Sequence, residues 1–222
     1  TAYNVTEAVI TIQNQPRVKQ AHYRIGDDMP LNGMTWKAAT DTTATNIPRN
    51  TNFRVRFQAY NNSGANAIWQ PQLEWSATSG SGFAIVPTST GSPPFFLTDT
   101  TQFINAATIA TVNFALGTGT VTSRLGGAYD TQNPASVSLT LENGYYTEME
   151  FNIQANSNAA YNTNYYFRLT DNGGALAAYD IIQAVITMQA EPPGAKQAHY
   201  RIGNDIALNA MSLKGWIDQR AI

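Results

Sequence analysis

The sequence predicts an all-β protein built as an antiparallel β-sandwich. Apolar and polar residues alternate with a period of two along much of the 222-residue chain, and this alternation marks strands with one buried face. Turns rich in Gly, Asn, Ser and Pro separate the alternating runs, and no long segment carries an apolar stripe at helical spacing. Many amphipathic strands joined by polar loops favour two packed sheets. A closed barrel is the alternative, because the same alternation permits it.

Two runs show the alternation most clearly. In the first, apolar residues alternate with Arg54 and Arg56, and in the second they alternate with Glu148 and Glu150. The charges share the same spacing on outer sheet faces, so they would form a cross-strand charge ladder if the two strands pair. Exposed pairs of this kind contribute little, ~0.2–1 kcal/mol each. The two runs are Phe53–Ala59 and Thr147–Ala155.

Further strands follow from shorter alternating segments, and Tyr23 and Phe167 are expected in the core. A short helical turn is also expected within Thr101–Ala110. The remaining predicted strands are Ala8–Gln13, Gln20–Ile25, Gln72–Trp75, Thr108–Phe114, Ser136–Leu141, Tyr165–Leu169 and Ile181–Met188.

One motif occurs twice. Gln20–Ala38 reads QAHYRIGDDMPLNGMTWKA, and Gln197–Gly215 reads QAHYRIGNDIALNAMSLKG. Upstream of each motif, Ala8–Gln13 (AVITIQ) is matched by Ala184–Gln189 (AVITMQ). Self-similarity over roughly 177 residues predicts a tandem array, with one complete unit flanked by parts of two others. The predicted divisions are a terminal strand and linker at 1–19, a complete unit at 20–189, and a linker with the start of a following unit at 190–222.

The repeated motif and the terminal strands are the predicted sites of assembly. The second linker, Ala190–Lys196, contains two consecutive prolines, which favour an extended spacer. An amphipathic strand without its own domain has unpaired edges and needs a partner. That partner is either a covalently preceding unit or a neighbouring chain that the strand joins by strand donation. The residues predicted to act in assembly are Val9, Ile10, Ile12, Gln20, His22, Tyr23, Gln197, His199 and Tyr200.

Acidic residues follow the motif in both copies. Asp27, Asp28 and Asp205 are interpreted first as turn-forming residues. An interdomain calcium site is the alternative, since hard oxygen ligands suit Ca²⁺. His22 and His199 occupy equivalent positions, but no Cys and no second His accompanies either at ligand spacing. We therefore expect structural histidines and no cofactor.

Composition argues against several functional classes. The net charge is −2 and only 13% of residues are charged, so the basic footprint of a nucleic-acid-binding protein is missing. No apolar stretch approaches ~18 residues, so direct membrane insertion is not expected. No nucleophile elbow, P-loop or dinucleotide fingerprint occurs, and we expect no enzyme. Abundant Trp and Tyr leave open a glycan-binding module.

Several motifs resemble a repeat found in very large secreted proteins of environmental bacteria. The segments QAHYRIGDD, NFRVRFQAYNNSG, YTEMEFNIQAN and YYFRLTDNG are similar to its successive strands. Ile25 and Gly26 stand where that repeat frequently has Trp and Arg, so this chain is a divergent member. The resemblance implies an Ig-like or fibronectin-like sandwich without an active site.

The expected function is accordingly a non-catalytic structural repeat of an extracellular surface filament, stalk or adhesin. Its expected partners are neighbouring copies of the same unit. One alternative is a self-polymerising pilus-like or sheath subunit assembled by strand donation. A glycan-binding module of a secreted protein, with surface glycans as partners, is another.

Overall fold

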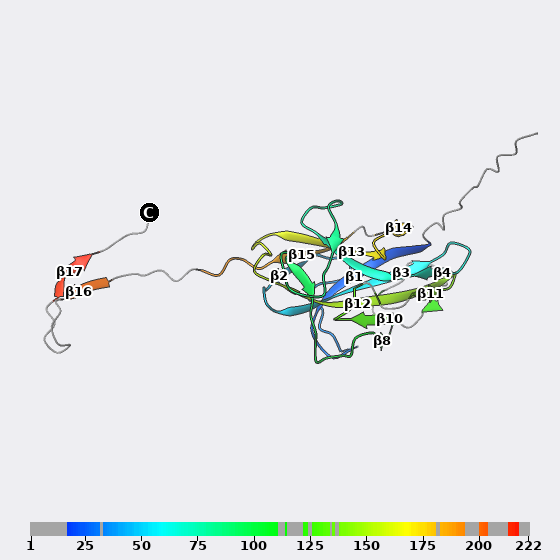
Figure 1. Cartoon of the computed structure of the whole chain (residues 1–222), viewed down its shortest axis with the longest axis horizontal. Coiled ribbons are helices and arrows are strands. Elements are labelled where there is room, and N and C mark those ends of the chain that lie inside the picture. Colours follow the sequence, from blue (N-terminus) through cyan, green and yellow to red (C-terminus); the bar gives the residue numbers. More distant parts are fainter. Residues whose placement is uncertain are drawn as a thin grey trace, which may run out of the picture. The chain divides into compact units, whose positions relative to one another are not determined.

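The computed structural model of the protein describes residues 17–31, 33–110, 114, 122–123, 126–133, 135, 138–180, 183–193, 200–203 and 213–217. Every regular element among them is a β-strand, which confirms the all-β prediction (Figure 1). The chain divides into two compact units, Thr1–Ala190 and Glu191–Ile222. The described part of the chain contains no helix that could cross a membrane. The predicted strand Ala8–Gln13 lies outside the described residues.

The first unit contains two main sheets and one small strand pair. The strands of the larger sheet are β1 (Val18–Asp27), β3 (Asn52–Asn61), β7 (Phe95–Leu97), β8 (Ala107–Ile109), β9 (Thr122–Ser123), β10 (Gly126–Tyr129), β12 (Tyr145–Ala155) and β14 (Ala178–Tyr179). The strands of the smaller sheet are β2 (Ala44–Ile47), β5 (Pro71–Ser76), β6 (Ala84–Ile85), β13 (Asn164–Asp171) and β15 (Ala184–Met188). The small pair is β4 (Ala67–Trp69) with β11 (Leu139–Leu141).

Both main sheets are mixed, which corrects the prediction of purely antiparallel sheets. The order is β14-β1-β3-β12-β10-β8 in the eight-stranded sheet, where β7 and β9 also pair with β12, and β2-β15-β13-β5-β6 in the five-stranded sheet. The long pairings β1–β3, β3–β12, β5–β13 and β13–β15 are antiparallel. The short pairings β1–β14, β9–β12, β10–β12 and β2–β15 are parallel. Parallel neighbours need crossover connections, and alternation within a strand carries no information about the direction of its neighbour.

The predicted helical turn within Thr101–Ala110 is wrong. Its last residues form β8, which pairs antiparallel with β10 so that Ile109 lies opposite Gly126. Ile109 is fully buried. Hydrogen bonding to a neighbouring strand, together with burial of one side chain, outweighs the weak local preference for a turn.

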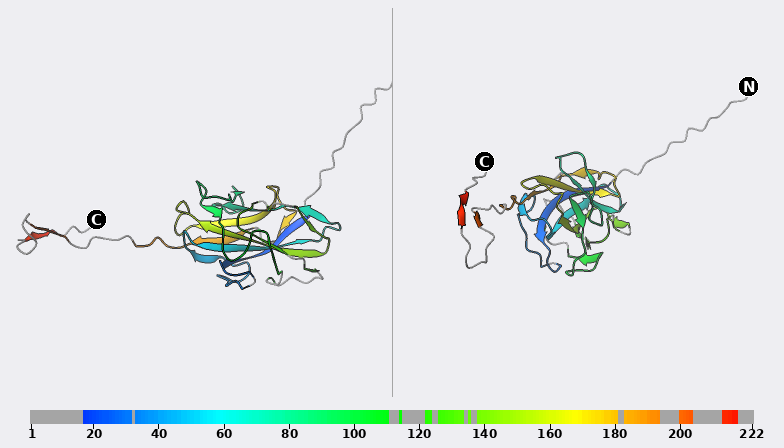
Figure 2. Two further views of the ribbon diagram at one scale, coloured as in Figure 1. Left: turned by 60° about the horizontal axis from the view of Figure 1, so that its bottom comes forward. Right: turned by 60° about the vertical axis from the view of Figure 1, so that its left-hand side comes forward.

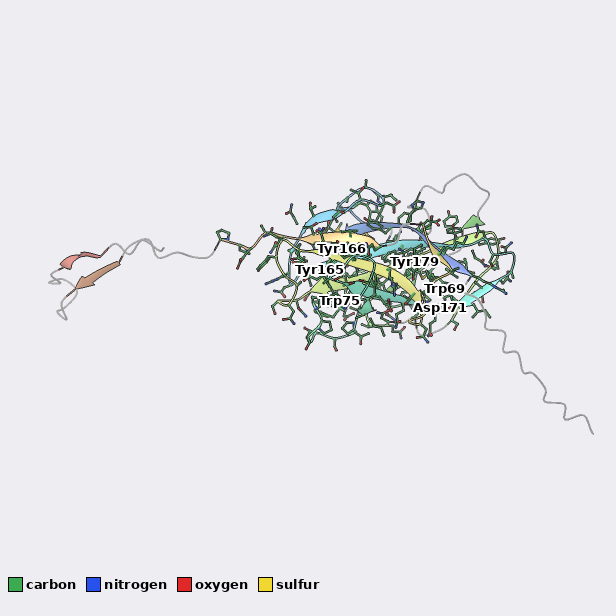
Figure 3. All side chains as sticks on the ribbon, turned by 90° about the horizontal axis from the view of Figure 1, so that it is seen from above. Trp69, Trp75, Tyr165, Tyr166, Asp171 and Tyr179 are labelled. Atoms are coloured by element: carbon green, nitrogen blue, oxygen red, sulfur yellow. The ribbon has the colours of Figure 1, made fainter. Side chains whose placement is uncertain are left out.

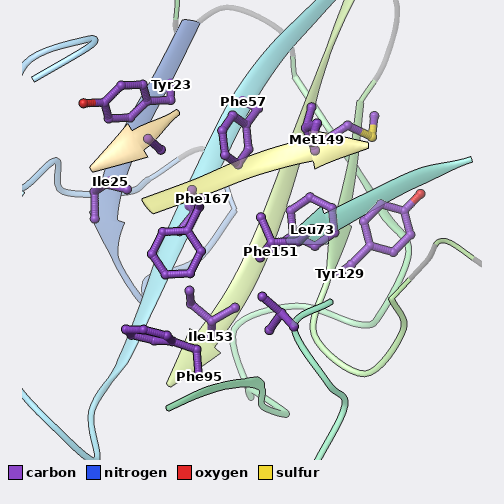
Figure 4. Close-up of a cluster of buried hydrophobic side chains, with 14 of the residues drawn as sticks. Tyr23, Ile25, Phe57, Leu73, Phe95, Tyr129, Met149, Phe151, Ile153 and Phe167 are labelled. Carbon is purple, nitrogen blue, oxygen red and sulfur yellow. The ribbon is translucent and has the colours of Figure 1, made fainter. Parts of the chain in front are cut away.

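The two main sheets share one hydrophobic core (Figure 4). Phe57 and Phe151 come from the larger sheet and Phe167 from the smaller, and none of the three is exposed to solvent. The Phe95 ring packs edge-on against Phe167 with centroids 5.0 Å apart, a favourable aromatic geometry. Tyr23 is 2% exposed, so the predicted burial of Tyr23 and Phe167 is confirmed. The unit therefore contains two separate sheets that contribute to one core.

The chain enters and leaves the first unit at opposite ends. Val18, which opens β1, pairs with Asn61 at the end of β3. The Gln189 amide, just after β15, donates to the Ile47 carbonyl shortly before β3 begins. Since β3 has 10 residues, these ends are separated by roughly 30 Å at about 3.3 Å per residue. Figures 1 and 2 show the blue start of β1 and the orange end of β15 at opposite ends of the unit.

The described part of the second unit is one antiparallel strand pair. It comprises β16 (Tyr200–Gly203) and β17 (Leu213–Ile217). Both strands belong to the second copy of the repeated motif or directly follow it.

Candidate functional site

Gln20, in the repeated motif, connects the two main sheets. It lies on β1, is fully buried, and its Oε1 accepts a hydrogen bond of 2.7 Å from the Leu169 amide of β13. The Tyr179 hydroxyl donates to the Leu169 carbonyl at 2.8 Å. β15 begins opposite Phe167, so it does not extend alongside Leu169. The side chains of Gln20 and Tyr179 therefore hydrogen-bond the part of β13 that β15 leaves unpaired. A buried backbone group without a partner would be costly, so the two side chains stabilise this end of the sheet.

Tyr23 makes a second connection from β1 to the smaller sheet. The backbone of Val185 in β15 hydrogen-bonds its hydroxyl, and burial raises the pKa of Tyr23 despite that bond. The Tyr23 amide donates to the Asp41 carboxylate at 2.9 Å. Figure 4 shows the Tyr23 side chain beside the strand arrow of β15. Both the ring and the hydroxyl of Tyr23 are therefore held inside the unit.

His22 lies on the other face of β1 and pairs with a carboxylate. Its Nδ1 is 2.6 Å from Asp41 Oδ2, and its ring stacks on Phe114 with centroids 6.3 Å apart. Sequence reasoning missed Asp41, although a signal was present: Asp218 follows His199 at the same distance at which Asp41 follows His22. The motif thus extends further along the chain than the first comparison of the two copies suggested.

The motif continues into a hairpin that recurs in the second unit. In the first unit, Gly26 forms an antiparallel bridge with Trp36, and a Cβ atom at Gly26 would overlap the Met34 side chain. In the second unit, Gly203 pairs with Leu213, and these residues occupy the corresponding positions of the second motif. The same pair of motif positions is therefore bridged in both copies of the sequence motif. In the first copy, the glycine allows close packing of the hairpin.

The other residues predicted to act in assembly are placed as follows. Gln20 and Tyr23 lie in the interior of the first unit, whereas the His22 side chain is 28% exposed. Tyr200 lies on β16 opposite Ile217. The predicted assembly residues that fall outside the described residues are Val9, Ile10, Ile12, Gln197 and His199.

The calcium candidates Asp27 and Asp28 face cationic partners. Asp27 forms an ion pair with Lys37. Asp28 accepts hydrogen bonds from Arg54 at 2.8 Å and from the Thr100 hydroxyl at 2.7 Å. A cation bound at Asp28 would have to displace the Arg54 guanidinium. Among the described residues, no three or more His, Asp or Glu side chains form a group that could hold a metal ion; the third candidate, Asp205, lies outside them.

Strands β3 and β12 do pair, so the charge ladder forms, but its predicted exposure is wrong. Arg56 lies directly opposite Glu150 in the β3–β12 pairing. Glu150 accepts hydrogen bonds from Arg54 at 2.7 Å and from Arg56 at 2.5 Å, and Glu148 accepts one from Arg56 at 3.1 Å. All four side chains are 0% exposed. We call this set, together with Asp28, the buried ion network.

Loops cover the outer face of the larger sheet, which explains why the ion network is buried. The Phe103 ring lies 4.7 Å from the Arg54 guanidinium, and the Trp36 ring lies 5.7 Å from that of Arg56. Such cation–π contacts are favourable where water is excluded. The buried side-chain amide of Gln58 has no hydrogen-bond partner among the residues that the structure describes. Because guanidinium groups hold the network's carboxylates in fixed geometry, the network fits a structural role better than proton transfer.

The described aromatic residues form no exposed platform of the kind that binds sugars. Trp69 is 2% exposed. Trp75 packs against Phe95, with ring centroids 5.9 Å apart, and Trp36 faces the Arg24 guanidinium at 4.4 Å. Figure 3 shows the labelled aromatic side chains spread along the unit. These residues serve mainly to pack the fold.

Comparison with protein-family models, curated proteins and solved structures finds no match to this chain. The repeat and the contacts made by its motif therefore carry what can be inferred about function.

Proposed function

We propose that this chain is a segment of a tandem array of β-domains and serves as a non-catalytic structural spacer in an extracellular filament, stalk or adhesin. The finer fold assignment, an Ig-like sandwich, belongs to the same proposal, and two facing sheets with a common core support it. Its short parallel edge pairings depart from a purely antiparallel sandwich. The extracellular location rests on the resemblance of the motifs to repeats of secreted bacterial proteins.

The recurrence of the hairpin is the observation that carries the proposal. Gly26 bridges Trp36 in one unit, and Gly203 pairs with Leu213 in the next. Identical residues alone would establish only a repeated sequence, whereas pairing of the equivalent residues in both copies supports a repeated structure. Repeated structural units joined in series generally provide length or several copies of a surface.

The path of the chain through the first unit also supports a spacer. The chain enters beside Asn61 and leaves beside Ile47, at opposite ends of β3. Each unit in a series of this kind adds its full length to the chain's reach, whereas units with adjacent termini add little. Pro192 and Pro193 lie just after the first unit, which ends at Ala190, and they favour an extended connection.

The position of β15 favours a covalent array over strand donation. By the repeat, Ala8–Gln13 corresponds to β15 of a preceding unit. In the present unit, β15 lies between β2 and β13, and its Ala184, Ile186 and Met188 side chains are buried. The position that a donated strand would take is therefore already filled by the chain itself.

Electron microscopy of the native assembly, with the chain traced through 190–196, tests the proposal. Continuous density leading into another complete copy of the fold is the expected result. Finding residues 8–13 of one chain in the β15 position of another would replace the spacer with a strand-donating filament. Finding isolated monomers would overturn both and favour a binding module.

A matched deletion separates the two assembly modes in solution. If units are joined covalently, a variant that lacks residues 1–13 should sediment as a monomer, as the full chain does. Strand donation predicts instead that the full chain polymerises and that the deletion abolishes polymerisation.

A further inference from the structure

The strands by which the chain enters and leaves the first unit belong to different sheets. β1 lies in the eight-stranded sheet and β15 in the five-stranded sheet. β1 starts opposite Asn61 and ends opposite Phe53, so it runs toward the end where the chain leaves. β15 runs in the same direction, because the Gln189 amide just after its end bonds the Ile47 carbonyl shortly before β3 begins.

Tension along the chain would pull these two strands past each other. A force applied before Val18 draws β1 back toward its own start, and a force applied after Met188 draws β15 forward. Each strand is then loaded along its length, so its ladder hydrogen bonds resist together rather than breaking one by one. The load must also cross from one sheet to the other, and contacts between the sheets carry this part.

Two side chains of the repeated motif cross between the sheets. Gln20 of β1 accepts a hydrogen bond from the Leu169 amide of β13, and the hydroxyl of Tyr23 is hydrogen-bonded by the backbone of Val185 in β15. Gln20 is 0% exposed and Tyr23 is 2% exposed, so water does not readily replace either bond. Sliding of β1 relative to the smaller sheet would break both.

We propose that Gln20 and Tyr23 form a mechanical clamp, which holds the incoming strand against the sheet of the outgoing strand when the array is under tension. This inference rests on the proposed spacer function. It gives a physical reason for the recurrence of both residues, as Gln197 and Tyr200, in the next copy. Each unit would resist the same load by the same contacts.

The test is constant-force unfolding of single full-length chains held at their two ends. The sequence has no cysteine, so one cysteine added at each end gives unique attachment points. Tyr23→Phe removes only the hydroxyl that bonds Val185 and keeps the ring. Tyr165→Phe is the matched control, because Tyr165 is also buried and its hydroxyl accepts a backbone hydrogen bond, from the Ala160 amide at 2.8 Å. That bond connects neither β1 nor β15.

The two variants should lose similar equilibrium stability but differ under force. Removing one hydrogen bond that resists unfolding lowers the free-energy barrier and makes unfolding about fivefold faster. The rate of unfolding under force measures this barrier. We expect this acceleration in Tyr23→Phe and less than about a twofold change in Tyr165→Phe. Gln20→Met, which removes the acceptor at similar length, should accelerate unfolding as well.

Equal acceleration in Tyr23→Phe and Tyr165→Phe, or no acceleration in Tyr23→Phe and Gln20→Met, would overturn the clamp. Neither result bears on whether units are joined in series, since electron microscopy of the native assembly decides that separately. A strand-donating filament seen there would overturn the spacer, whatever the unfolding rates.

Discussion

The two faces of strands β3 and β12 differ in chemistry but not in exposure. On the inner face, Phe57 and Phe151 pack into the core between the sheets, while on the outer face Arg56 and Glu150 pair under a cover of loops. All four side chains are 0% exposed. One face excludes water by hydrophobic packing and the other by charge pairing beneath aromatic rings.

The difference shows that alternation reports the chemistry of a face rather than its contact with solvent. A buried apolar face gains free energy from removal of apolar surface from water. A buried charged face gains little on balance, because desolvation of the ions offsets much of their attraction. The outer face therefore contributes mainly specificity, since any shift in the pairing of β3 and β12 would leave a charge buried without its partner.

The largest expected effect comes from removing the central charge of the buried ion network. Glu150→Gln keeps the volume but leaves Arg54 and Arg56 facing a neutral amide, and loss of one partner from a buried pair costs ~3–5 kcal/mol. Urea denaturation of the full chain measures this loss. A loss below ~1 kcal/mol would mean that water reaches the network and weakens its pairing.

The neighbouring residue tests the inner face by the same measurement. Phe151→Ala removes a ring from the core and should cost ~3–5 kcal/mol through lost contacts and the cavity left behind. A similar loss from Glu150→Gln and Phe151→Ala would show that the two faces are equally intolerant of change. A much smaller loss for Phe151→Ala would indicate that the sheets separate easily.

A smaller, pH-dependent effect is expected at Asp130, at the edge of the outer face. Burial, followed by the nearby charge of Asp99, raises the pKa of Asp130 above its ordinary value. Because the folded state binds this proton more tightly, its stabilising contribution is complete below the unfolded-state pKa and is lost as pH rises through the folded-state pKa.

Asp130→Asn should therefore gain stability relative to the parent chain as pH rises from acidic to neutral. Urea denaturation of both chains across that range gives the difference directly and cancels the titration of other carboxylates. A difference that stays constant with pH, or that falls toward neutral pH, would contradict the assigned burial.

The smallest effect is expected for the exposed ion pair in the motif hairpin. The Asp27 and Lys37 side chains are 42% and 23% exposed, and exposed pairs contribute ~0–1 kcal/mol. Lys37→Gln should therefore change the free energy of unfolding by no more than that, in contrast with Glu150→Gln. A larger loss would mean that the hairpin carries more of the unit's stability than its exposure suggests.

Local sequence patterns predicted much of the fold because they act over short distances. The alternation in Phe53–Ala59 and Thr147–Ala155 predicted two strands and the faces of their side chains, and the same reasoning predicted Tyr23 and Phe167 in the core. At β8 the local pattern predicted both a helical turn and an overlapping strand, and pairing with a distant strand decided between them. The partner of His22 was missed, although the repeat itself carried the signal in Asp41 and Asp218.

The sequence by itself determined many of the strands and the polarity of their faces, since these depend on neighbours along the chain, and it contains the repeated motif. Only the tertiary structure decided that the charged face is covered, that some edge strands run parallel, and that Gln20 and Tyr23 reach across to the other sheet. The bond from the Leu169 amide to Gln20 joins residues 149 positions apart. Contacts over such distances depend on how whole sheets and loops pack, and the pattern within a single strand does not encode this packing.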